Sequence, residues 1–159
     1  MSTFELAIPT IMRHEGGYTW DQNDPGGETN FGISRKSYPD LDIKNLTAED
    51  AVAIYQRDWW DRYGYGRIDA QCVATKILDM AVDMGASRAH KIAQEAVSCT
   101  PDGILGPQTI QALNFAVAVD CVARMGILQA NHYRELVVNN PALGKFLKGW
   151  LARASDSIT

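Results

Sequence analysis

The segment His14-Glu15-Gly16-Gly17-Tyr18 places an acidic residue at the end of the first helical pattern in the sequence. Upstream of it, Phe4, Ile8 and Ile11 precede Glu15 at helical spacing, so all four residues share one helix face. The two glycines then end the helix. We therefore expect the Glu15 carboxylate to lie on the apolar side of a helix, at its last turn.

A short polar hairpin follows the two glycines. The chain from Tyr18 to Ile33 reads as a short aromatic piece, a turn over residues 21–27, and a second short piece from Thr29 to Ile33. This is the only clear β signal in the sequence. Because the hairpin returns beside Glu15, the helix end and the hairpin together predict a cleft.

Helical patterns separated by glycine and proline fill the remainder of the chain. Thr47 to Asp50 resembles a capping box that begins a helix, and Pro107 suits a first helical position. Pro9 leaves the start of the first helix open. Further helices are predicted near residues 73–84, ending near Gly85, at 87–97, from Pro107 to about 138 with Gly126 as a candidate break, and after Pro141. The sequence therefore predicts a mainly α (α+β) fold with one small β-hairpin near the N-terminus.

Length and composition favour one folded unit. A chain of 159 residues with 46% hydrophobic and 21% charged residues is ordinary for a single globular domain. We expect one domain over residues 1–159, with the catalytic signature in about 1–85 and a helical half in about 86–159. The net charge of −4, without clustered Lys and Arg, argues against a nucleic-acid partner. No stretch is long enough for membrane insertion, and we expect a monomer.

The expected setting of Glu15 suits a particular kind of chemistry. A carboxylate held against apolar surface loses solvation, which raises its pKa, so that it keeps its proton and can act as a general acid. Cleavage of a glycosidic bond requires such an acid. It also requires a second carboxylate or polar group that stabilises positive charge or positions water on the other face of the sugar.

Candidates for this second group lie on the hairpin. The side chains there that can take the role are Asp21, Asp24, Glu28, Thr29 and Asn30. We favour Asp24, which precedes the rigid turn Pro25-Gly26-Gly27, and Thr29, which begins the returning strand. The alternative for Asp24 is that it only caps its own turn.

The same segments resemble glycoside hydrolase family 108, the N-acetylmuramidases found in phage endolysins and related prophage proteins. The resemblance rests on Glu15 to Tyr18 and on Asn23-Asp24-Pro25-Gly26-Gly27-Glu28-Thr29-Asn30-Phe31-Gly32-Ile33. It continues, in the order of the family, through Tyr55 with Trp59-Trp60, residues 79–82 with Gly85, residues 102–109, and residues 149–151 with Arg153. It covers essentially the whole chain.

The resemblance implies a lysozyme-like fold and carries the catalytic glutamate of the family onto Glu15. Phage-type lysozymes outside the family also have an Asp nine residues after their glutamate, the offset of Asp24 here. Their Thr corresponds to Asn30, next to Thr29, so the hydroxyl assignment stays open between the two positions. A further departure is Asp83, where we expect the family to have Asn.

Other side chains are candidates for substrate binding or for purely structural roles. We expect Tyr18, Asn30 and Tyr55 to bind substrate, the tyrosines by stacking on sugar rings. His14, His90 and His132 lack ligand-like spacing, so we expect no metal and no other cofactor. The cysteines Cys72, Cys99 and Cys121 are expected to be buried free thiols.

The segment Asp102 to Thr109 resembles the Asp-Gly turn of small peptidoglycan-binding modules. It is explained equally by a tight loop followed by a helix that begins at a proline. The sequence alone leaves wall binding by this turn undecided.

The function expected from these features is hydrolysis of the glycan strands of bacterial peptidoglycan by an N-acetylmuramidase. A lytic transglycosylase using the same glutamate, and a non-catalytic wall-binding or secretion-associated protein of the same fold, are the alternatives. Because Met1 to Ile11 lacks the features of a signal peptide, we expect synthesis in the cytoplasm of the bacterial host and action on the wall after release.

Overall fold

The computed structural model of the chain describes residues 1–20 and 27–156. Its α-helices are α1 (Phe4–His14), α2 (Ala48–Tyr55), α3 (Gln71–Met84), α4 (Ala86–Ala96), α5 (Pro107–Phe115), α6 (Ala118–Asn139) and α7 (Leu147–Ala154). Its strands are β1 (Thr19–Trp20), β2 (Glu28–Asn30) and β3 (Ile33–Ser34). Short 3-10 turns η1 (Ile43–Asn45), η3 (Tyr65–Arg67) and η4 (Pro141–Phe146) and a π-helical turn η2 (Gln56–Asp61) complete these elements. The predicted mainly α fold is confirmed.

Helix α1 forms in spite of its internal proline. Phe4, Ala7 and Ile11 are buried on one side, so packing of that side holds a helix from which Pro9 withholds one backbone hydrogen bond. Arg13 and His14 place basic side chains in the last turn, where positive charge interacts favourably with the negative end of the helix dipole. The apolar stripe expected from the sequence is therefore present and leads directly to residue 15.

The β element is a three-stranded antiparallel sheet in the order β1-β2-β3. The predicted second strand, 29–33, is interrupted by a two-residue turn at Phe31 and Gly32, whose φ angles are 49° and 74°. Two consecutive residues in the left-handed region are the signature of a tight hairpin turn between paired strands. The predicted turn over residues 21–27 lies outside the described residues except for Gly27.

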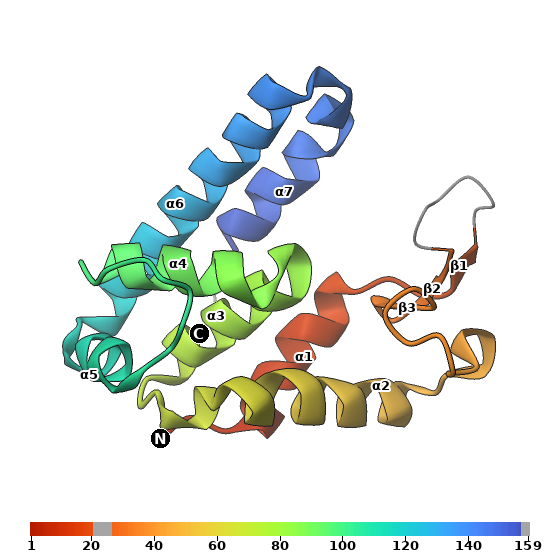
Figure 1. The fold of residues 1–159 in the computed structure, drawn as a ribbon, viewed down its shortest axis with the longest axis horizontal. Coiled ribbons are helices and arrows are strands. Elements are labelled where there is room, and N and C mark those ends of the chain that lie inside the picture. Colours follow the sequence, from red (N-terminus) through yellow and green to blue (C-terminus); the bar gives the residue numbers. More distant parts are fainter. Residues whose placement is uncertain (21–26, 157–159) are drawn as a thin grey trace.

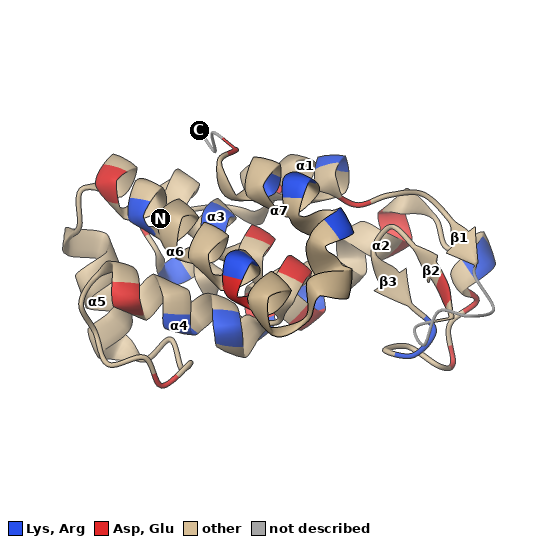
Figure 2. Cartoon of the chain, turned by 90° about the horizontal axis from the view of Figure 1, so that it is seen from above, with Lys and Arg blue, Asp and Glu red and all other residues tan. Residues whose placement is uncertain are grey.

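Helix α3 lies at the centre of the molecule, packed against α1, α4 and α6 (Figure 1). Its buried residues include the two charged side chains Lys76 and Asp79, both 0% exposed. The sheet lies at one end of the molecule, while α6 and α7 run side by side as an antiparallel pair. Basic and acidic residues are interspersed along the helices (Figure 2).

Most predicted helix limits have a local cause that the structure confirms. The Thr47 side chain accepts from the Asp50 backbone at 3.2 Å while Asp50 accepts from the Thr47 backbone at 3.1 Å, which is the capping box. Gly85 ends α3 with a φ of 88°, and Pro107 is the first residue of α5.

Two expectations require correction. The helical run after Pro107 breaks at Ala116 and Val117, whereas Gly126 lies inside an uninterrupted α6. A Cβ at position 126 would lie 2.8 Å from the Ala154 carbonyl oxygen, so this glycine admits the end of α7 and does not end a helix. Of the three free cysteines, Cys121 is buried, but Cys72 and Cys99 are only partly buried.

No single helix among the described residues is both long enough and apolar enough to cross a membrane. Helices α5 and α6 meet the criterion only as a pair, and they are bent by 116° relative to each other.

Candidate active site

Glu15 is the residue directly after α1, and its side chain is 14% exposed. Its backbone N–H donates to the Ile11 carbonyl at 3.0 Å, and its extended backbone then directs the chain into Gly16. Helix α1 thus places the Glu15 carboxylate at the edge of the core, where most of the side chain is inaccessible to water.

The turn between β2 and β3 packs against this carboxylate. A Cβ at position 32 would lie 2.8 Å from the Glu15 Cδ and 2.6 Å from the Tyr55 hydroxyl oxygen, so only glycine fits there. Tyr55 is buried, and its hydroxyl donates to the Phe31 carbonyl at 2.8 Å. This bond holds Phe31 in a left-handed conformation that is strained for an aromatic residue. The sheet is therefore fixed at contact distance from Glu15.

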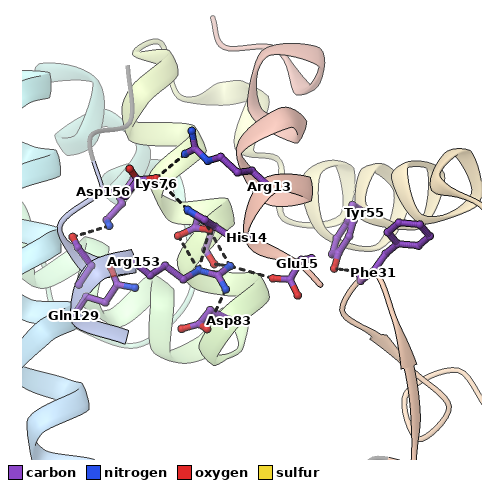
Figure 3. A network of polar contacts seen from close by, with 12 residues as sticks. Arg13, His14, Glu15, Phe31, Tyr55, Lys76, Asp83, Gln129, Arg153 and Asp156 are labelled. Atoms are coloured by element: carbon purple, nitrogen blue, oxygen red, sulfur yellow. Dashed lines mark hydrogen bonds and ion pairs between the residues drawn. The ribbon is translucent and has the colours of Figure 1, made fainter. Parts of the chain in front are cut away.

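On its other side, Glu15 meets Arg153 of helix α7 (Figure 3). The Arg153 Nη2 donates to Glu15 Oε1 at 3.1 Å and to Asp79 Oδ1 at 2.8 Å. Its Nη1 donates to Asp83 Oδ1 at 3.2 Å. A planar guanidinium has several donors in fixed directions, so one side chain serves three carboxylates that come from α1 and α3.

His14 extends this network to the last described residue. Its Nδ1 lies 2.8 Å from Asp79 Oδ1, and its Nε2 lies 3.0 Å from Asp156 Oδ2. Both partners are carboxylates, so both ring nitrogens act as donors when the imidazole is protonated. The hydrogen bond to Asp79 raises the pKa of His14, against the opposing effect of burial. Arg13 also donates to Asp156 Oδ2, at 2.6 Å.

The surroundings of Glu15 favour its protonated form. Burial is the largest cause that raises the pKa of this carboxyl, and the charges of Asp83 and Asp79 add to it. Arg153 opposes them through its charge and its hydrogen bond, but the pKa of Glu15 stays above its ordinary value. A raised pKa extends the pH range over which the carboxyl keeps the proton that a general acid must donate.

Two hollows flank this centre. One, of about 310 Å³, touches the residues that pack on Glu15; Gly32, Ser34, Tyr38, Tyr55, Asp58 and Arg62 are among its lining residues. The other, of about 710 Å³, is lined by Arg13, His14, Asp83, Gly149, Trp150, Ala152, Arg153 and Asp156. Both volumes fall in the range of roughly 300–1,000 Å³ that ligand sites occupy.

Two family patterns match the chain one after the other. The pattern described as Glycosyl hydrolase 108 matches residues 8–85, and the one described as Predicted Peptidoglycan domain matches residues 88–155. Residues 8–85 thus belong to glycosyl hydrolase family 108. Membership of this family, together with the peptidoglycan domain, gives a glycoside hydrolase that acts on peptidoglycan.

A solved structure supports the same assignment. The chain is similar to the structure of SagA from Brucella abortus, with a TM-score of 0.80 and 28% sequence identity over 96% of this chain and 89% of that one. No curated protein matches the chain. The similarity spans both halves of the chain, so the fold shared with that structure includes α6 and α7 as well as the segment around Glu15.

The candidates for the second catalytic group have different positions. Asp24, like Asp21, lies outside the described residues. Thr29 is half-buried in β2, paired with Thr19 on one side and Ser34 on the other. Assignment of the second group to Asp24 and Thr29 therefore stays a prediction.

Glu28 and Tyr18 are bonded to each other at the outer part of the sheet. Glu28 accepts from both Nε and Nη2 of Arg35, at 2.8 and 2.6 Å, and from the Tyr18 hydroxyl at 3.0 Å. The hydrogen bond from Arg35 is the main cause that lowers the pKa of Glu28, so this carboxylate stays ionised and paired. Tyr18 is 40% exposed and keeps a ring surface that a substrate can reach.

Asn30 and Tyr55 fix the position of the turn between β2 and β3 through their hydrogen bonds. The Asn30 amide is buried and donates to the carbonyls of Ile43 and Leu46, at 3.1 and 3.3 Å, which ties β2 to the loop around η1. Tyr55 is 2% exposed. Tyr55 also lines the smaller hollow, and our expectation that Asn30 and Tyr55 contact substrate stays a prediction. Their hydrogen bonds position the turn that faces Glu15.

Sequence reasoning assigned no chemistry to Arg153 or Asp79. Arg153 lies 138 positions from Glu15, so no local pattern connects the two. Asp79 did carry a usable signal, because an acidic residue inside the apolar pattern of α3 must find a partner when it is buried. Asp83 also belongs here: it accepts a hydrogen bond from the Tyr133 hydroxyl as well as from Arg153.

Buried Gln94 holds the Asp-Gly turn at residues 102–109 in place through hydrogen bonds. Gln94, 1% exposed, donates to Asp102 Oδ1 at 2.7 Å and to Thr109 Oγ1 at 3.2 Å, and accepts from the Gly103 N–H at 2.8 Å. The two polar side chains of the motif thus bond within the protein. This arrangement supports the tight-loop interpretation over wall binding by the turn.

Proposed function

We propose that this family 108 protein is an N-acetylmuramidase that hydrolyses the bond from N-acetylmuramic acid to N-acetylglucosamine, with Glu15 as the general acid. The observation that carries the proposal is the Glu15 carboxyl, which is buried against Gly32 and has a raised pKa although Arg153 contacts it. It is the acid that bond cleavage requires.

In the proposed reaction the proton of Glu15 passes to the oxygen that leaves the muramic acid C1. The C1–O bond breaks, and positive charge develops on the sugar ring. Water supplies the new oxygen at C1 and gives up a proton to a base. Asp24 is our candidate for the group that faces the sugar from the other side, with Thr29 or Asn30 next to it; the burial of Asn30 favours Thr29.

The test compares wild-type protein with Glu15→Gln in the clearing of purified peptidoglycan. We expect the substitution to slow clearing by at least about 100-fold, the usual effect of removing a general acid. Its fold is expected to be retained, because burial already penalises the charged form of Glu15. If neither protein clears the wall, the protein is a non-catalytic wall-binding protein of this fold; equal clearing by both would overturn the assignment of Glu15 as the acid.

Mass spectrometry of the released fragments separates hydrolysis from transglycosylation. A hydrolase leaves reducing muramic acid ends, and these are the expected products. Anhydro-muramic acid ends would show that the sugar's own hydroxyl replaces water and would overturn the hydrolase proposal. Synthesis in the host cytoplasm and an endolysin role stay predictions.

A further inference from the structure

The two halves of the chain build one site. Glu15 belongs to the segment matched by the glycosyl hydrolase pattern, and Arg153, whose guanidinium contacts it at 3.1 Å, belongs to the segment matched by the peptidoglycan pattern. Asp79 and Asp83 of α3 join the two through Arg153. The second half is therefore part of the catalytic centre and is not a separate module beside it.

The larger of the two hollows opens beside this junction. Arg153 and Asp83, which belong to the network around Glu15, also line this hollow of about 710 Å³. The hollow continues along α7 past Trp150 and Gly149. The hollow is thus adjacent to the catalytic centre, since Arg153 lines the hollow and also contacts Glu15.

Trp150 gives this hollow a fixed aromatic surface. Its ring stacks on Tyr133 with centroids 5.1 Å apart and an interplanar angle of 22°, and Phe146 lies 5.6 Å from it. The Tyr133 ring is anchored in turn, because its hydroxyl donates to Asp83 and accepts from Gln129. Trp150 itself is only partly buried. Two aromatic neighbours therefore hold the Trp150 ring in place, and the part of the indole that stays accessible lines the hollow, where it can contact the apolar face of a sugar.

The remaining lining residues supply polar partners and space. Arg153 and Asp83 offer donors and acceptors for hydroxyl and amide groups, next to the aromatic ring. Gly149 is exposed, and a Cβ built on it would meet no atom within 4 Å. The wall of the hollow is open at this position because a side chain is missing.

We propose that this hollow binds an N-acetylated sugar of the glycan strand, adjacent to the sugar cleaved at Glu15, with Trp150 as its platform. The inference rests on the proposed function for the nature of the ligand. In this proposal the second half of the chain binds the glycan strand on one side of the scissile bond.

The decisive variant is Gly149→Leu, which adds a side chain at the wall of the hollow, where a Cβ meets no other atom within 4 Å. Leucine favours a helix more than glycine does, so the melting temperature is expected to stay constant or rise. Binding of peptide-free glycan strands is measured by calorimetry in the Glu15→Gln background, where strands are not cleaved. We expect Gly149→Leu to weaken binding by at least about tenfold.

The matched control is Lys148→Leu, which adds the same side chain at the neighbouring exposed position, outside the residues that line the hollow. It is expected to change affinity by less than about twofold. Equal affinities of the Gly149→Leu variant and its parent would overturn the proposal.

A second pair of variants tests the platform itself. Trp150→Ala is expected to raise KM for wall clearing more than it lowers kcat, because the ring binds a remote sugar equally in the ground and transition states. Trp150→Phe keeps an aromatic ring on Tyr133 and is expected to restore part of the affinity. If Trp150→Ala does not fold, Trp150→Phe and Gly149→Leu still carry the test, and unchanged strand binding by both would contradict the platform role.

The outcomes separate this proposal from the proposed function. If neither wild type nor Glu15→Gln clears the wall while Gly149→Leu loses strand binding, the sugar site stands and the acid assignment fails. If Glu15→Gln is inactive and Gly149→Leu binds strands like its parent, the acid assignment stands and the sugar site fails.

Discussion

Three carboxylates share the Arg153 guanidinium, and the pKa of Glu15 depends on how that sharing is balanced. Burial of Glu15 and the charges of Asp83 and Asp79 favour the protonated acid, while Arg153 favours the ionised form. A guanidinium engaged by one carboxylate alone would lower the pKa of that group far more. Here the same cation also satisfies Asp79, which is fully buried, so its stabilisation of ionised Glu15 is limited.

This balance predicts the effect of Arg153→Lys. A lysine has a single ammonium that cannot reach all three carboxylates with the same geometry. It therefore stabilises ionised Glu15 less than Arg153 does, and the pKa of Glu15 rises further. Because the acid acts in its protonated form, activity is lost as pH rises through that pKa. The alkaline limb of the kcat/KM profile should therefore move to higher pH. Arg134→Lys, on the exposed side of α6, is the control; an unchanged limb in the Arg153 variant would refute this role.

Gly32→Ala tests the contact between the sheet and the acid. The added Cβ would lie 2.8 Å from the Glu15 Cδ, and position 32 has a φ of 74°, so the carboxyl or the turn must move. Displacement of a catalytic group by about 1 Å can cost about 100-fold in rate, and we expect a loss of that order in kcat. Gly85→Ala is the matched control, since it has a positive φ but open space around its Cβ. Equal kcat losses in both variants would assign the effect to backbone strain alone.

At the scale of helices and strands, sequence reasoning succeeded where the cause is local. The capping box at Thr47, the proline at the start of α5 and the glycine at the end of α3 each act within one turn, and each was predicted. The apolar stripe of α1 likewise placed Glu15 at the edge of the core. Elements whose form depends on a distant partner were not predicted. Gly126 is the clearest case, because the nearby carbonyl of Ala154 is what leaves no room for a side chain at position 126.

The packing of α6 against α7 predicts the effect of Gly126→Ala. In an isolated helix alanine would be favoured over glycine by about 1 kcal/mol. Here the new Cβ would lie 2.8 Å from the Ala154 carbonyl oxygen, which also accepts from buried Lys76 at 3.1 Å. We expect a net loss of about 1–3 kcal/mol in the free energy of unfolding, measured with urea. Gly149→Ala, with open space around its Cβ, should instead stabilise; stabilisation by both variants would show that α7 yields without cost.

At the scale of the whole molecule, charged groups from both ends of the chain meet in its interior. His14 ends α1, Asp79 lies in the middle of α3, and Asp156 follows α7, so their contacts join the first and last helices to the central one. Arg153 adds the fourth member of this set. The fold and the active site are thus held by the same ion pairs, and conditions that neutralise these groups should weaken both.

This linkage predicts how His14→Asn changes stability with pH. The folded-state pKa of His14 is raised, mainly by its hydrogen bond to Asp79, so protonated His14 stabilises the fold fully below its ordinary pKa of about 6.5, and this contribution is lost as pH rises through the folded-state value. The free-energy difference between wild type and His14→Asn should therefore be largest below about pH 6.5 and shrink at higher pH. His132→Asn is the control of opposite sign, because burial lowers the pKa of His132 and its protonation opposes folding. Urea unfolding from pH 5 to 9 measures both, and a His14 difference that grows with pH would contradict the assignment of this histidine as a charged link between α1, α3 and the C-terminal segment.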